Sequence, residues 1–165
     1  MKRFRITKYN PAFRNESGEY LLDEWTSIYD IGKSFHEGIL KELEYMQKEE
    51  SYLRAIMLLL NENDIQQMCI VQLEKYIDEN FFDSISEEEQ ILIQNIEVNM
   101  LVTIDKIMSL SRMILRELIW AKFETLDREF VLEFGYDYYM YVSCEKISDE
   151  RKEDILKLGL FVEEM

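Results

Sequence analysis

Glycine and proline, the residues that most often interrupt regular secondary structure, are confined to the two ends of this chain. All five glycines and the single proline lie outside residues 39–134. The interval between them is rich in Leu, Glu, Lys, Met and Gln, which favour helices, whereas Gly and Pro are the poorest helix formers. We therefore expect helices over residues 39–126 and strands nearer the two chain ends.

Apolar side chains in this interval recur at the spacing of an amphipathic helix. A first run covers residues 40–60. A second run covers residues 65–77, although its segment MCIV also fits a buried strand, so either structure is open there. Ser86 and Glu89 form a capping box that predicts a helix start. From there the pattern continues over residues 87–126 as one helix or two, on which Arg116 and Trp120 are expected to stack.

Segments near both chain ends have the character of strands. Phe4 and Ile6 alternate with polar residues, and residues 130–144 (FVLEFGYDYYMYVSC) are dense in branched and aromatic side chains, with a break at Gly135. A last short strand is expected in LFVEE. The sequence thus predicts a single domain over residues 1–165 of the α+β class. In it, a small antiparallel sheet built from both chain ends packs on a central helical bundle, and the protein is helix-rich.

The charge of the chain is large and unevenly distributed. The net charge is −15, yet residues 1–15 contain five basic side chains and no acidic one. The rest of the chain is therefore strongly acidic. Such a field repels phosphate groups and anionic lipid surfaces and attracts basic proteins. We expect a basic protein partner, no direct binding to nucleic acid and no association with membranes.

Other features of the sequence bear on its compartment. The longest uninterrupted apolar run, residues 55–60, is far shorter than the roughly 20 residues that cross a bilayer. The basic N-terminal residues are not followed by the apolar region of a secretory signal. Cys69 and Cys144 lie far apart without CxxC spacing, which favours buried thiols over a disulfide. These features predict a cytoplasmic protein.

Common catalytic and cofactor motifs are absent from the sequence. It contains no GxSxG, no Walker loop, no GxGxxG, no HExxH and no CxxC, and His36 is its one histidine. A His-rich zinc site is therefore excluded, and we expect no cofactor and no metal. The sequence favours a non-enzymatic protein while leaving an enzyme open.

One acidic segment is a candidate surface for a basic partner. Residues 76–105 hold eight acids and no basic residue, and two phenylalanines lie among the acids. Charges of this kind steer a partner and aromatic side chains anchor it. The segment predicts an immunity-type or inhibitory protein that masks a basic partner such as a nuclease toxin, unless its acids only cap helices and confer solubility. The predicted contact residues are Asp78, Glu79, Phe81, Phe82, Asp83, Glu87, Glu88 and Glu89.

An alternative site combines aromatic residues with isolated polar ones, as ligand pockets do. It predicts a small-molecule-binding protein, or an enzyme of unknown reaction, with a pocket near residues 136–139. The sequence leaves the oligomeric state open, and residues 138–144 are the candidate edge strand of a homodimer. The predicted pocket residues are Trp25, His36, Arg116, Tyr136 and Tyr138.

Five segments distributed along the chain carry a family resemblance. RFRITKYNP, DEWTSIYDIGK, LRELIW, FGYDYYMYV and GLFVEE together resemble an uncharacterised family of small acidic bacterial proteins with no assigned activity. The resemblance spans most of the chain and implies a bacterial cytoplasmic setting. It brings no functional residues with it.

Overall fold

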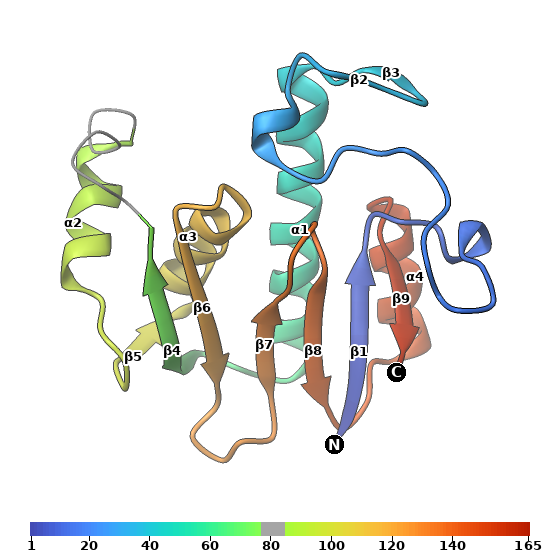
Figure 1. The fold of residues 1–165 in the computed structure, drawn as a ribbon. Coiled ribbons are helices and arrows are strands. Elements are labelled where there is room, and N and C mark those ends of the chain that lie inside the picture. The colour runs from blue at the N-terminus through green and yellow to red at the C-terminus, as the bar shows by residue number, and fades with distance from the viewer. Residues whose placement is uncertain (77–84) are drawn as a thin grey trace.

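The computed structural model describes residues 1–76 and 85–165. Seven antiparallel strands form one sheet in the order β5-β4-β6-β7-β8-β1-β9, and α1, α3 and α4 lie behind it (Figure 1). The strands of this sheet are β1 (Lys2–Thr7), β4 (Gln67–Lys75), β5 (Leu101–Thr103), β6 (Ile119–Glu124), β7 (Val131–Phe134), β8 (Met140–Cys144) and β9 (Phe161–Glu164). The helices are α1 (Glu42–Glu62), α2 (Glu87–Asn95), α3 (Ile104–Leu115) and α4 (Asp149–Lys157).

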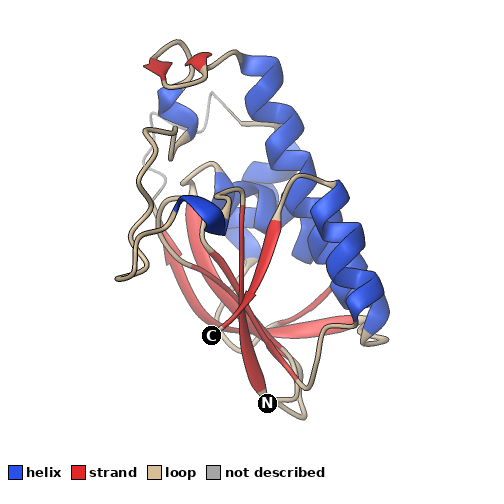
Figure 2. Ribbon diagram, turned by 90° about the vertical axis from the view of Figure 1, so that its right-hand side faces the viewer, coloured by secondary structure: helices blue, strands red, loops and turns tan. Residues whose placement is uncertain are grey.

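The long helices lie against one side of the sheet in the side view (Figure 2), and buried apolar side chains from both layers form the core between them. In β6, Ile119, Ala121 and Phe123 are buried, and the three residues that alternate with them are half-buried. Strand β8 repeats this alternation. Since successive side chains of a strand point to opposite faces, one face of the sheet packs on the helices. The other face is partly open to solvent, and we call it the open face.

The helical bundle predicted for residues 39–126 is interrupted by strands. Helices α1, α2 and α3 form within this interval, but β4, β5 and β6 lie between them. Residues 65–77, left open between helix and strand, contain β4, and the helical run that begins at Ile104 ends at Leu115 instead of continuing to residue 126. The α+β class is correct, but the sheet is larger than predicted and the centre is not a bundle.

Left-handed residues other than glycine make the turns that the sequence pattern does not reveal. Asp64 (φ 52°) precedes β4, Asn99 (φ 70°) precedes β5, and Glu117 (φ 61°) precedes β6. Glycine adopts this conformation at least cost, so its absence from an interval is normally read as an absence of sharp turns. Here three residues other than glycine adopt the left-handed backbone conformation at the turns.

The two chain ends lie side by side in the sheet, as predicted. Strand β1 is flanked by β8 and β9, and Arg5 is paired with Tyr141 on one side and Glu163 on the other. Strand β8 also pairs with β7. Residues 138–144 are therefore not an edge strand, because the edges of the sheet are β5 and β9.

A long connection leads from β1 to α1 over the upper end of the sheet in Figure 1. It contains two short 3₁₀ helices (Pro11–Phe13 and Ile28–Asp30) and a small hairpin made of β2 (Ser34–Phe35) and β3 (Gly38–Ile39). This connection packs close to the loop between β7 and β8, where the candidate sites lie.

Candidate functional site

The connection between β7 and β8 is a tight loop with an unusual backbone. The Gly135 N–H donates to the Tyr139 carbonyl oxygen (2.7 Å), and the Tyr139 N–H donates to the Tyr136 carbonyl oxygen (3.1 Å). Asp137 and Tyr138 are both left-handed, with φ of 56° and 64°. For a bulky residue this conformation costs roughly 1–3 kcal/mol and persists where surrounding contacts impose it.

Tyrosine hydroxyls from other elements impose this conformation. Tyr52 on α1 donates to the Tyr138 carbonyl oxygen (2.6 Å), and Tyr9 donates to the Asp137 carbonyl oxygen (2.7 Å). The Tyr138 side chain is buried, and its hydroxyl lies 2.9 Å from the Leu115 carbonyl oxygen. Burial raises the pKa of Tyr52 and Tyr138, so both hydroxyls keep their protons at neutral pH. The loop is thus fixed by donors that do not titrate in the physiological range.

The same network continues to a buried ion pair. The Tyr138 and Tyr45 hydroxyls are 2.6 Å apart, and Tyr45 donates to Glu49 (3.0 Å). Glu49 is buried and accepts two 2.8 Å hydrogen bonds from Arg116, which raise the Arg116 pKa. Such a bidentate pair binds the end of α3 to α1. Arg116, predicted to line a pocket, is a partner of Glu49 and lines none of the cavities described below.

Three aromatic residues that are at least partly exposed lie at the upper end of the open face. Tyr136, at the tip of the loop, is 93% exposed, Tyr76 at the end of β4 is 55% exposed, and Trp120 on β6 is half-buried. Among the described residues these three rings make no stacking contact with another ring. We call Tyr76, Trp120 and Tyr136 the aromatic patch.

Two hollows border Tyr136. The edge hollow has a volume of about 290 Å³ and the inner hollow about 230 Å³. Gly135 lines both, so the start of the loop borders each hollow. The edge hollow is lined by Glu74, Tyr76, Trp120, Glu133, Phe134, Gly135 and Tyr136.

Carboxylates surround the aromatic patch. Glu74 and Glu133 line the edge hollow, and Glu117 and Asp137 line the inner one. Glu74 accepts a 2.6 Å hydrogen bond from the Tyr76 hydroxyl, which raises the pKa of Tyr76 to about 12. The patch therefore offers ring faces and negative charge together, which is the combination that attracts cations.

On the side of the open face formed by β8, β1 and β9, rings pair with the protein's own cations. The Arg3 guanidinium lies over the Tyr141 ring at 4.4 Å, and those of Arg5 and Arg14 lie 5.6 and 5.5 Å from the Tyr139 ring centroid. We call these five residues the Arg–Tyr column. Glu163 completes it through two hydrogen bonds from Arg5 (2.7 and 3.0 Å) and an ion pair with Arg14 (3.4 Å).

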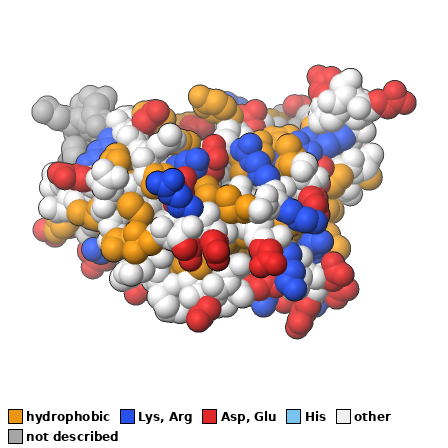
Figure 3. Space-filling view, turned by 90° about the horizontal axis from the view of Figure 1, so that it is seen from below, with side chains coloured by type: hydrophobic (Ala, Val, Ile, Leu, Met, Phe, Trp, Pro, Cys, Tyr) orange, Lys and Arg blue, Asp and Glu red, His pale blue; other side chains and the backbone are white. Residues whose placement is uncertain are grey.

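Charge compensation also extends to the lower side of the molecule, where the termini lie. Figure 3 shows Lys and Arg side chains next to Asp and Glu side chains there, with hydrophobic side chains between them. Lys2 pairs with Glu164 (2.7 Å), and Arg3 lies 3.8 Å from Glu133. All five basic side chains of residues 1–15 thus form ion pairs with acidic side chains of the same chain.

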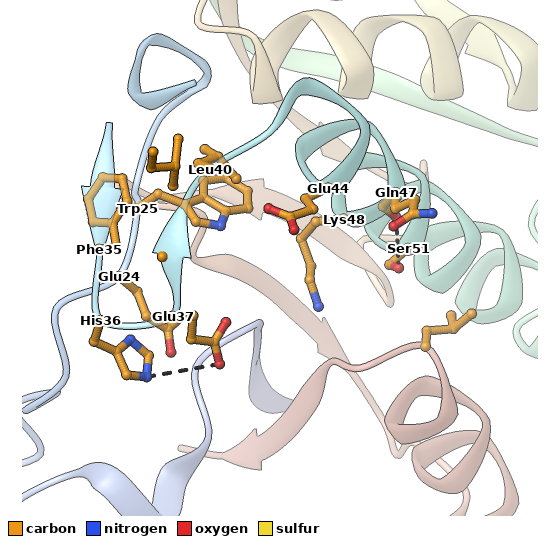
Figure 4. A pocket seen from close by; sticks show the side chains of 13 residues that line it. Glu24, Trp25, Phe35, His36, Glu37, Leu40, Glu44, Gln47, Lys48 and Ser51 are labelled. Carbon is orange, nitrogen blue, oxygen red and sulfur yellow. Dashed lines mark hydrogen bonds and ion pairs between the residues drawn. The ribbon is translucent and has the colours of Figure 1, made fainter. Parts of the chain in front are cut away.

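A separate pocket of about 460 Å³ lies beneath the β2–β3 hairpin (Figure 4). Trp25 and His36 line one side, and Lys48 on α1 points into it from the other. Lys48 donates to the Gly159 carbonyl oxygen (3.1 Å), and burial lowers its pKa. We call this cavity the hairpin pocket. Its lining mixes rings with both signs of charge, since it includes Phe35, Glu24, Glu37 and Glu44 as well.

A buried lysine lies behind this pocket. Lys8 Nζ is 4.3 Å from the rings of both Tyr9 and Trp25 and donates to Glu24 (2.9 Å). Burial lowers the Lys8 pKa, although Glu24 opposes this effect. The combination of a cation over a ring, neutralised by a carboxylate, is therefore used both here and in the Arg–Tyr column.

The structure divides the predicted pocket residues between two places. Trp25 and His36 line the hairpin pocket, whereas Tyr136 and Tyr138 line the inner hollow. The Trp25 and Tyr138 rings are in edge contact at 5.0 Å, so the two cavities lie close to each other. The predicted stacking of Trp120 on Arg116 along a helix is wrong. Trp120 lies instead on β6, where its indole N–H donates to the Phe134 carbonyl oxygen (2.7 Å).

The predicted acidic surface is partly described. Ser86 accepts from the Glu89 N–H, and Glu89 accepts from the Ser86 N–H, so the predicted capping box is confirmed. Glu87, Glu88 and Glu89 begin α2 and make no ion pair with other described residues. The remaining predicted contacts lie outside the described residues: Asp78, Glu79, Phe81, Phe82 and Asp83.

Sequence reasoning missed Tyr76, Trp120, Glu74 and Glu133 as one site. Once β4 and β6 are known to pair, Glu74 is directly opposite Trp120. The signal was the alternation in IWAKFE, which has the period of a strand.

Two other classes of site, a membrane span and a metal centre, are not found in residues 1–76 and 85–165. No helix there is long and apolar enough to span a bilayer. No group of three or more His, Cys, Asp or Glu side chains is arranged there to hold a metal ion. Cys144 is a buried thiol whose pKa is raised by burial to about 11, and Cys69 is a half-buried thiol.

Comparison with known proteins found no family model, no curated protein and no solved structure that matches this chain.

Proposed function

We propose that this chain is a non-enzymatic protein-binding module that recognises a basic protein partner through the aromatic patch. The observation that carries the proposal is Tyr136, which is 93% exposed at the tip of a rigid loop with carboxylates on both sides. An aromatic ring so exposed adds little to the stability of the fold. A ring held on a fixed loop binds with little loss of conformational entropy.

The composition of the patch matches the energetic centre of a protein interface. Tyrosine and tryptophan dominate such centres, where a few residues carry most of the binding energy. Glu74, Glu117, Glu133 and Asp137 would select a basic partner and disfavour an acidic one. This assignment moves the centre of recognition from the segment of residues 78–89 to the upper end of the sheet.

In this proposal the acids at the start of α2 guide the partner. Unpaired surface carboxylates accelerate the encounter with a basic protein at low salt. The protein would then mask its partner in the bacterial cytoplasm, as an immunity-type inhibitor of a nuclease toxin does. Its own net charge of −15 is opposite to that of a protein that binds nucleic acid.

Affinity capture from the source cell at low salt tests the proposal. Wild-type protein is expected to retain a basic protein, and Tyr136→Ala to lose at least about tenfold in affinity, as is usual for an interface centre. Leu126→Ala is the matched control, since Leu126 is 71% exposed in the turn between β6 and β7, at the opposite end of the sheet. Equal capture by both variants would refute the role of the patch.

The steering role has its own test. The association rate should fall steeply between about 0.01 and 0.15 M salt, because the Debye length shrinks from about 30 Å to about 8 Å. Replacing Glu87, Glu88 and Glu89 by Gln should give the high-salt rate already at low salt while dissociation changes little. An unchanged low-salt rate in the folded triple variant would show that these acids are ordinary surface.

A second candidate function is favoured by the hairpin pocket. Trp25, His36 and Lys48 line one cavity whose volume is within the range of small-molecule sites. Lys48 and Glu37 supply opposite charges, which suits a zwitterion such as a free amino acid. A thermal-shift screen of amino acids tests this function, and any stabilisation should disappear in Lys48→Met. The absence of any shift across the panel would remove it.

A further inference from the structure

We infer that the edge hollow is a receptor for a single arginine side chain of the partner. The inference rests on the proposed function and names the chemical group that the patch reads. It is built on Glu74, Tyr76, Trp120, Glu133 and Tyr136, which all line the hollow.

The protein's internal contacts show how this fold accommodates a cation. Arg5 lies over Tyr139 and donates two hydrogen bonds to Glu163. Lys8 lies over Tyr9 and Trp25 and donates one hydrogen bond to Glu24. Each site combines a ring face with a carboxylate. The edge hollow repeats these two components with Tyr76, Trp120 and Tyr136 as the rings and Glu74 as the carboxylate.

The edge hollow differs in having no internal cation over its rings. No described Lys or Arg lies over Tyr76, Trp120 or Tyr136. Residues 77–84 cannot supply one either, because their sequence IDENFFDS contains no basic residue. Aromatic rings next to carboxylates attract a cation, and here it has to come from another molecule.

Neighbouring charges leave Glu74 as the main acceptor. Glu133 is shared with Arg3, 3.8 Å away, and is directly across from Lys122 in the sheet. Glu74 has the Tyr76 hydroxyl as its partner and no ion pair with a described residue. One carboxylate therefore keeps its charge available at the hollow.

Geometry favours a guanidinium over an ammonium group. A guanidinium is planar, stacks on aromatic faces and donates two parallel hydrogen bonds to one carboxylate, whereas a lysine ammonium is a compact and strongly hydrated charge. Glu74 is directly opposite Trp120 in the β4–β6 pairing, so one planar group can meet both a ring face and a carboxylate. The hollow, at about 290 Å³, suits one side chain better than a cofactor.

The test uses two small probes that differ in charge but hardly in shape. N-acetyl-arginine amide and its neutral analogue N-acetyl-citrulline amide are titrated into the full-length protein. The indole N–H resonances of the two tryptophans are followed by NMR. The arginine probe should shift the Trp120 resonance and leave that of Trp25 in place, and the citrulline probe should shift neither. Equal shifts with both probes would overturn the inference.

Variants test the components of the receptor. Glu74→Gln and Tyr136→Ala should each weaken the arginine probe about two- to fivefold, the usual range for one exposed cation–ring or charge contact. Glu117→Gln, which removes the same charge from the inner hollow, is the matched control and should have a smaller effect. An equal effect of Glu74→Gln and Glu117→Gln would mean that general electrostatics attract the probe, which contradicts a receptor at the edge hollow.

A third probe, N-acetyl-lysine amide, tests the choice of cation. It should bind more weakly than the arginine probe, and equal binding would overturn the assignment to arginine. The result of the arginine titration can be told apart from the result of the partner-capture experiment. If Tyr136→Ala abolishes partner capture while the arginine probe never shifts Trp120, the receptor is refuted and the protein-binding function stands. If the arginine probe shifts Trp120 but no basic protein is captured, the protein-binding function is refuted and the arginine site stands.

Discussion

Two neighbouring parts of the open sheet face, the Arg–Tyr column and the aromatic patch, use the same kinds of residue in opposite ways. In the Arg–Tyr column, Arg3, Arg5 and Arg14 lie over rings, and Glu163 forms ion pairs with two of them. In the aromatic patch, rings and carboxylates are present, but no described Lys or Arg lies over the rings. The difference follows from where the basic residues lie in the chain, because N-terminal strand β1 lies between β8 and β9, away from β4 and β6.

The net charge of this protein is a poor guide to the charge of any one part of its surface. A net charge of −15 describes the whole protein, yet the column is nearly neutral in its own right, with three arginines close to Glu133 and Glu163. The patch and the start of α2, by contrast, present acids such as Glu74 and Glu87 that make no ion pair with other described residues.

High pH should unfold the protein by deprotonating its buried tyrosines. Burial raises the pKa of Tyr9, Tyr45, Tyr52 and Tyr138 above the ordinary value of 10. Their contribution to stability is complete below about pH 10 and is lost above it, because the unfolded chain ionises first. At about pH 11 each loses about 1.4 kcal/mol, or roughly 5–6 kcal/mol for the four, which is comparable to a typical total stability.

Circular dichroism and tyrosinate absorbance as functions of pH measure this effect. The loss of structure and the main rise of tyrosinate absorbance should coincide near about pH 11. Tyr52→Phe serves as the control, since its stability should depend less steeply on pH by one proton. Full ionisation of all ten tyrosines in a still folded protein would contradict the burial of these four rings.

Removing the shared carboxylate should damage the column. Glu163→Gln leaves Arg5 and Arg14, whose side chains are 17% and 7% exposed, without their counter-charge. We expect a loss of about 2 kcal/mol in the free energy of unfolding, measured with urea. Glu133→Gln is the control, and it should cost less than about 0.5 kcal/mol because Arg3 is half exposed and 3.8 Å away. Equal costs would mean that the column is no better paired than the surface.

A methyl group at Gly135 should disturb the boundary between the aromatic patch and the Arg–Tyr column. The added Cβ would lie 2.9 Å from the Tyr141 ring and 3.4 Å from the Tyr139 Cβ. Gly135→Ala should therefore cost about 1–2 kcal/mol of stability, as overpacking usually does. Combining it with Tyr141→Ala should recover part of that cost, which a double-mutant cycle measures. Strict additivity would show that the ring does not limit the glycine.

The patch itself should contribute almost nothing to stability. Tyr136→Ala is expected to change the free energy of unfolding by less than about 0.5 kcal/mol, because the ring is 93% exposed. The urea midpoint and slope report this value. A loss above about 1 kcal/mol would show that the Tyr136 ring packs against the protein in solution, and the patch would then not be an open binding surface.

The strands at the chain ends were predictable because they carry both alternation and familiar breaks. Phe4 and Ile6 are buried in β1, and Gly135 begins the loop between β7 and β8. The interior strands were not predictable in the same way. Their turns use Asp64, Asn99 and Glu117, which are left-handed without being glycine.

The candidate site was harder to predict than the fold. Tyr136 and Tyr138 were selected from a dense aromatic run, and the structure places both next to the inner hollow. Tyr76 and Trp120 are 44 positions apart in the numbering, and their meeting depends on the β4–β6 pairing. Register of this kind arises from tertiary packing, so a local pattern of residues does not contain it.

The position of β1 between β8 and β9 also has a consequence for the order of folding. Translation makes this strand before its partners, which begin at Met140 and Phe161. At roughly 5–20 residues per second, β1 waits about 8 to 30 s before both partners exist. Its pairing has a large sequence separation and is expected to be slow. Of the seven strands of this sheet, the first to be synthesised is thus among the last to be paired, and until then its apolar and basic side chains remain available to chaperones.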